Sequence, residues 1–89
     1  MSAAAWGLSI AIMANGFYPN PEMMAYHPVP SKEDCIQKAK DAWQELSIIK
    51  KYRMDLYTLC HAYPSRKKDD RVWIICDENM VCKANGEQV

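Results

Sequence analysis

The sequence predicts an α+β fold in which one main helix packs on a small, mostly antiparallel sheet of three or four strands. One long segment has the apolar spacing of an amphipathic helix, and several short segments have the patterns of strands. The chain has 89 residues, which is enough for a single small domain. One helix over one face of a sheet is the simplest arrangement that buries both apolar surfaces.

The first element is an apolar segment that we interpret as a strand over residues 5–14. From Trp6 to Ile12, large apolar residues alternate with small ones, which is the period of a strand covered on one side. The alternatives are a signal peptide and an N-terminal helix. A signal peptide has basic residues before its apolar run, and no Lys or Arg precedes this one. The run is also too short to cross a bilayer as a helix, so we expect no membrane span.

Residues 15–30 are expected to be an extended, irregular connector. They contain four of the five prolines, and proline restricts both its own backbone and that of the residue before it. The connector is also rich in apolar side chains, which either pack across the domain or present a surface to a partner. The candidate partner-binding residues are Phe17, Tyr18, Met23, Met24 and Tyr26.

The clearest element is a helix over residues 31–51. Ser31 is a good N-cap residue, and Asp34 three positions later gives a pattern close to a capping box. From Cys35 onward, apolar residues recur at helical spacing and form one face that needs a sheet or a helix to cover it. Residues 51–63 could continue this helix, but they are rich in strand formers, so we favour a break near residues 51–54.

Three further strands are expected in the second half of the chain. They are a strand over 56–62, a strand over 71–77 and a short edge strand over 80–84. Residues 71–77 form a short apolar run bounded by charges, which indicates a strand buried on both faces or nearly so. Glu78 and Asn79 predict a tight turn, so the last two strands would form a hairpin, followed by a tail.

The four cysteines are the richest chemical signal, and the sequence leaves their state open. Cys76 would face Cys82 across the expected hairpin, within reach of a disulfide, and Cys35 would then remain for Cys60. Four cysteines allow three complete pairings, and sequence alone does not choose among them. We favour the reduced form, as in a cytoplasmic protein; the alternative is a secreted or periplasmic domain held by two disulfides.

No catalytic site, metal site or cofactor is predicted. Cysteine and histidine ligands for zinc are present, but they lack the close pairs that common zinc sites use. The glycine-rich phosphate-binding patterns and the serine nucleophile motif are missing from a chain with three glycines. We therefore expect a protein that is not an enzyme.

Charge gives one further candidate site. With 11 basic and 11 acidic residues the net charge is zero, which argues against binding nucleic acid by bulk electrostatics. Two basic clusters could still meet at one end of the molecule and bind an anion, so a nucleic-acid-binding domain is kept as a less favoured alternative. The candidate anion-binding residues are Lys50, Lys51, Arg53, Arg66, Lys67, Lys68 and Arg71.

The leading hypothesis is a non-catalytic module that binds or inhibits another protein, with a homodimer as a candidate assembly. Its motivation is an apolar and aromatic content larger than the thin core of a small domain hides. In general character, though not in any motif, the chain is similar to small phage-encoded proteins. With a phage origin, inhibition of a host factor and an accessory role in the virion would both fit this hypothesis.

Overall fold

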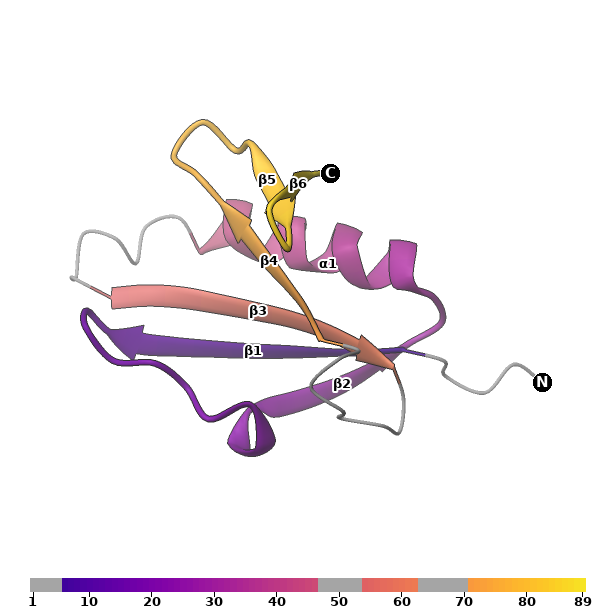
Figure 1. Cartoon of the computed structure of the whole chain (residues 1–89), viewed down its shortest axis with the longest axis horizontal. Helices are drawn as coiled ribbons and strands as arrows, with labels where there is room; N and C mark the ends of the chain where they lie inside the picture. The colour runs from indigo at the N-terminus through magenta and orange to yellow at the C-terminus, as the bar shows by residue number, and fades with distance from the viewer. Residues whose placement is uncertain (1–5, 47–53, 63–70) are drawn as a thin grey trace.

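The computed structural model describes residues 6–46, 54–62 and 71–89, and these form one antiparallel sheet with a helix on one face (Figure 1). The sheet order is β2-β1-β3-β4-β5-β6. The elements are β1 (Trp6–Ala14), the 3-10 turn η1 (Pro21–Met23), β2 (Ala25–Val29), α1 (Lys32–Glu45), β3 (Met54–Ala62), β4 (Val72–Cys76), β5 (Cys82–Ala84) and β6 (Glu87–Gln88).

The predicted sheet of three or four strands is wrong, although the small α+β domain is confirmed. The described residues form six strands, and the sheet rather than the helix makes up most of the fold. One missed strand is β2, which lies in the segment expected to be irregular. Its Pro28 is tolerated because β2 is an edge strand that pairs only with β1, so one side of its backbone needs no partner.

The other missed strand is β6, which lies in the expected tail. Asn85 and Gly86 have positive φ angles of 50° and 90°, and the register places Ala84 opposite Glu87. Positive φ at both central residues is the geometry of a two-residue hairpin turn, for which Asn-Gly is the preferred sequence. The sequence therefore held the signal for this hairpin, but the strand beyond it is only two residues long.

The helix begins where the sequence predicts and ends earlier. The Ser31 hydroxyl accepts a hydrogen bond from the Asp34 backbone N–H at 3.1 Å and caps the first turn. The helix ends at Glu45, with Leu46 as its C-cap, so the end predicted at residue 51 is too late. Apolar residues continue at helical spacing past Leu46, so the sequence pattern does not show where the helix ends. Residues 47–53 lie outside the described part of the chain.

Two buried connections fix α1 over the middle of the sheet. Cys35 forms a disulfide with Cys60 of β3, and their Cα atoms are 6.0 Å apart. About two turns further along the helix, the Trp43 indole N–H donates to Thr58 Oγ1 at 2.9 Å and to the Ile74 carbonyl at 3.2 Å. The Thr58 hydroxyl donates to the same carbonyl at 2.6 Å. These groups satisfy one another inside the core, as buried polar groups must.

A second disulfide joins Cys76 and Cys82, which face each other in the register of β4 and β5 with Cα atoms 3.9 Å apart. All four cysteines are therefore bonded, and none is free. The expectation that the four thiols remain reduced is not met in this structure. The β4–β5 hairpin brings Cys76 and Cys82 together, whereas Cys35 meets Cys60 only because α1 lies over β3.

Removing the two disulfides separately should destabilise the protein unequally. In the chain-entropy description, the stability lost with a disulfide increases with the length of the loop that it closes. The two loops here have sequence separations of 25 residues for Cys35–Cys60 and 6 residues for Cys76–Cys82. We expect losses of about 3.5 kcal/mol for C35A/C60A and about 2 kcal/mol for C76A/C82A. Urea unfolding of both double variants measures the difference, and an equal or reversed order would contradict the assigned role of the helix-to-sheet bridge.

Gly7 of β1 is required because the Tyr26 ring lies directly against it. A Cβ built on Gly7 would overlap the ring carbons of Tyr26. Tyr26 in turn stacks on the buried His61 ring, with centroids 4.6 Å apart, and His61 Nε2 lies 3.2 Å from Ser9 Oγ. The missing side chain therefore leaves room for the Tyr26 ring to cross β1 at Gly7 and reach His61 of β3.

We expect Gly7→Ala to destabilise the protein by about 1–3 kcal/mol, because the added methyl group must displace the Tyr26 ring. The matched experiment is a double-mutant cycle with Tyr26→Ala, measured by urea unfolding. With the ring removed, Gly7→Ala should cost much less. A cost that is the same in both backgrounds would show that the ring contact is not the reason for glycine.

Candidate functional site

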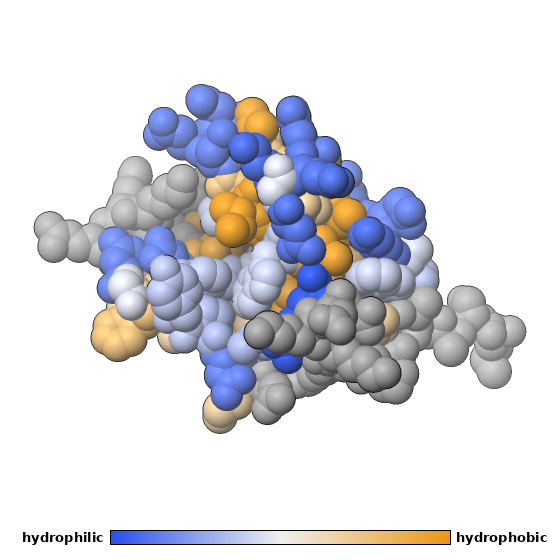
Figure 2. All heavy atoms as spheres, viewed as in Figure 1, coloured by the Kyte–Doolittle hydropathy of each residue, from blue (hydrophilic) through white to orange (hydrophobic). Residues whose placement is uncertain are grey.

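The sheet face opposite α1, here called the open face, holds the candidate site. In β4, Ile74 and Cys76 are buried toward α1, so the alternation of a strand directs Trp73 and Ile75 to the other side. Tyr57 of β3 reaches the same side between the buried residues Leu56 and Thr58. Figure 2 views this face and shows apolar atoms gathered around β4 and β5 with hydrophilic atoms about them.

Three aromatic rings stand together on the open face. The Tyr57 ring lies 5.9 Å from that of Tyr18 at an interplanar angle of 57°, and 6.4 Å from that of Trp73 at 83°. The Tyr57 hydroxyl donates to the Phe17 carbonyl at 3.4 Å, which links the segment after β1 to β3. We call Tyr18, Tyr57, Trp73 and Ile75 the aromatic patch.

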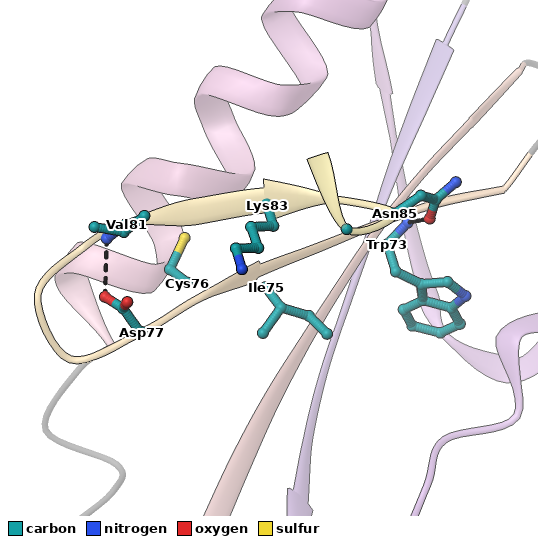
Figure 3. Close-up of a pocket in the computed structure, with 8 residues that line it drawn as sticks. Trp73, Ile75, Cys76, Asp77, Val81, Lys83 and Asn85 are labelled. Atoms are coloured by element: carbon teal, nitrogen blue, oxygen red, sulfur yellow. Dashed lines mark hydrogen bonds between the residues drawn. The ribbon is translucent and has the colours of Figure 1, made fainter. Parts of the chain in front are cut away.

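The aromatic patch surrounds a hollow of about 250 Å³, whose remaining wall is Pro19. A second hollow of about 310 Å³ lies on the other side of Trp73 and Ile75, which line both. The first is almost entirely apolar, whereas the second includes Asp77, Lys83 and Asn85 (Figure 3). The two hollows therefore adjoin each other on the open face, and Trp73 and Ile75 form the ridge between them.

The polar groups of the second hollow shape its walls. One carboxylate oxygen of Asp77 accepts hydrogen bonds from the backbone N–H groups of Asn79 and Val81, both at 2.9 Å, and holds the β4–β5 turn. The Asn85 amide accepts from the Trp73 backbone N–H at 3.0 Å and donates to the Arg71 carbonyl at 3.2 Å. These bonds hold the backbone at both ends of β4.

Lys83 is the exposed cation of the second hollow. It lies opposite Ile75 in the register of β4 and β5, and Figure 3 shows its side chain extending toward Ile75. Among the described residues, no ion pair engages it. Its charge is therefore available to a ligand at the edge of the apolar ridge.

The structure separates the partner-binding residues predicted in the connector. Phe17, Tyr18 and Met23 are exposed by 63%, 81% and 83%, whereas Met24 is buried in the core. Tyr26 is half-buried against His61. Only Tyr18 of the five belongs to the aromatic patch, although Phe17 adjoins it through the bond to Tyr57.

The sequence did not bring Tyr57, Trp73 and Ile75 together as one surface. The apolar run over residues 71–77 indicates a strand buried on both faces or nearly so, yet Ile75 is 55% exposed between buried Ile74 and Cys76. Strand alternation was the available signal. It became informative only once the position of α1 showed which side is covered.

The candidate anion-binding cluster stays a prediction. Arg71 is described and half-buried, and its carbonyl accepts the Asn85 hydrogen bond. The other six members lie outside the described residues. They are Lys50, Lys51, Arg53, Arg66, Lys67 and Lys68.

Among the described residues, no group of three or more His, Cys, Asp or Glu side chains could hold a metal ion. Ser9 and His61 form a buried pair, with 0% and 1% exposure, and present no surface to a substrate. Across these same ranges, no helix is both long and apolar enough to span a bilayer.

Comparison with known proteins adds no assignment to this geometry. No family model, curated protein or solved structure matches the chain.

The Tyr57 hydroxyl is a spectroscopic reporter of the aromatic patch. Burial, the neighbouring Asp55 carboxylate and Tyr18 together raise its pKa above the ordinary value of 10.0. Because the pKa of Tyr57 is higher in the folded state than in the unfolded state, the neutral phenol stabilises the folded state at pH values below the unfolded pKa. That stabilisation is lost as the pH rises through the raised pKa.

We expect Tyr57→Phe to remove one late component from an alkaline absorbance titration of the tyrosines. Asp55→Asn, which removes the carboxylate, should move that component to lower pH. If Tyr57→Phe instead removes a component with an ordinary midpoint, Tyr57 is not packed as described.

Proposed function

We propose that this chain is a non-catalytic binding module that recognises another protein through the aromatic patch. The single observation that supports this most strongly is the exposure of Ile75 beside Trp73 and Tyr57, on a sheet face that α1 does not cover. Where one face of an antiparallel sheet meets water, its outward side chains are usually polar. An apolar, aromatic patch at that position is typical of an interaction site.

The composition of the open face also supports this proposal. Its centre holds Trp73, Tyr57 and Ile75, and its edge holds Lys83 and Asp77. Protein interfaces have this arrangement, with aromatic residues enriched at the centre and polar residues at the rim. Buried tryptophan and tyrosine are also the side chains on which binding energy most often concentrates.

The two disulfides support a site of action in an oxidising compartment, so the module we propose is secreted or periplasmic. Disulfides persist in such compartments and are rare in the reducing cytoplasm. This proposal replaces the cytoplasmic expectation. The phage origin, the inhibitor or virion role, and the homodimer stay predictions, and none of them is needed for the argument from the aromatic patch.

Substitutions on the aromatic patch should abolish capture of a partner. Trp73→Ala and Ile75→Ser remove central apolar side chains, and Val89→Ser is a matched control because Val89 is exposed by 41% at the C-terminus. Against lysates and secretions prepared under oxidising conditions, we expect any partner bound by the parent and the control to bind Trp73→Ala at least about 30-fold more weakly.

Quantitative mass spectrometry of the captured proteins, followed by titration of the best candidate, measures this effect. Thermal unfolding of each variant shows that the fold is intact. A partner that binds all three variants equally, or the loss of binding in Val89→Ser alone, would overturn the proposal.

A further inference from the structure

We propose that the open face takes an extended peptide segment containing a proline and an acidic residue. The proline sits in the hollow of the aromatic patch, and the acidic side chain pairs with Lys83. The inference rests on the proposed function, because it names the kind of partner segment that the same surface recognises.

The first hollow has the chemistry that recognises proline. Its walls are Tyr18, Tyr57, Trp73, Ile75 and Pro19, with neighbouring rings steeply inclined to one another around about 250 Å³ of space. Proline-rich segments dock into grooves lined by aromatic rings, and their preformed extended conformation lowers the entropic cost of binding.

Trp73 also carries a polar group on its ring. Its backbone N–H is used by Asn85, but no hydrogen bond of the described residues uses its indole N–H. Figure 3 shows the indole nitrogen on the side of the ring away from Ile75. An extended proline-rich peptide has no internal hydrogen bonds, so its carbonyl groups are free to accept from such a donor.

The second hollow adds the preference for an acidic residue. Asp77 is committed to the turn through Asn79 and Val81, and the Asn85 amide is committed to Trp73 and Arg71. Lys83 is exposed and lines this hollow opposite Ile75. Asp77 keeps its negative charge at the turn, but Lys83 is the charged side chain that lies beside Ile75 and so nearest to the first hollow. The side chain that complements Lys83 there is a carboxylate.

Strand spacing sets the distance between the two features of the ligand. The first hollow lies between β3 and β4, and Lys83 is on β5, so about one and a half to two strand spacings, or roughly 7–10 Å, separate them. A polyproline-type segment rises about 3.1 Å per residue, so the acidic residue stands about two or three positions from the proline.

The test uses the disulfide-intact full chain and three synthetic decapeptides. One is proline-rich with a single glutamate three positions from a central proline, the second has glutamine in place of glutamate, and the third has alanine in place of every proline. Fluorescence anisotropy gives the affinity, and backbone amide NMR shifts locate the binding surface. Thermal unfolding confirms that each variant remains folded.

We expect the glutamate peptide to bind and to shift resonances of Trp73, Ile75 and Lys83. The glutamine peptide should bind about twofold to fivefold more weakly, as for an exposed ion pair, and Lys83→Gln should abolish that difference. Trp73→Ala should weaken both proline-rich peptides by at least about tenfold, whereas Val89→Ser should bind like the parent.

Three results would overturn the inference: no binding at about 1 mM peptide, equal binding of the alanine peptide, or a glutamate preference that survives in Lys83→Gln. Light scattering that shows a dimer lost in Ile75→Ser would also overturn it, because a second copy would then occupy the face. If a captured protein binds through Trp73 but the peptides do not bind, the proline-and-acid ligand is wrong and the proposed function stands. If neither a captured protein nor a peptide binds through Trp73, both proposals are wrong.

Discussion

The helix α1 is 14 residues long and lies on one face of a six-stranded sheet, and this asymmetry governs the molecule. Such a helix is about 10 Å wide with its side chains, and six strands extend across about 24 Å, so one helix covers the centre of one face. The core lies there, around Cys60 and Ile74. The opposite face has no helix of its own among the described residues, and its Trp73 and Ile75 are the side chains that a partner would cover.

The connections of α1 give this asymmetric fold its rigidity. A domain of this size has a thin core, so a covalent link and a shared hydrogen-bond network contribute a large part of its stability. Cys35–Cys60 supplies the link, and Trp43, Thr58 and Ile74 supply the network. Because β3 and β4 are held from behind, the aromatic patch on their open side is preorganised, which lowers the cost of ordering it on binding.

The sequence predicted those features of the fold that depend on residues close together in the chain. The N-cap at Ser31 located the start of α1, and strand patterns located four of the six strands. The strand β2 depends on an edge position that tolerates Pro28, which no local pattern reveals. The aromatic patch comes from three separate segments, so its residues could be recognised as aromatic in sequence but not as neighbours.

The central claim is that the aromatic patch is accessible in the free protein while the rings beneath α1 are not. Photochemically induced nuclear polarisation enhances only those tryptophan and tyrosine rings that a dissolved dye can reach. We expect enhanced signals from Tyr18 and Trp73 and none from Trp43, which is 9% exposed and hydrogen-bonded through its indole N–H. A silent Trp73 in the monomer, or an enhanced Trp43, would contradict the account.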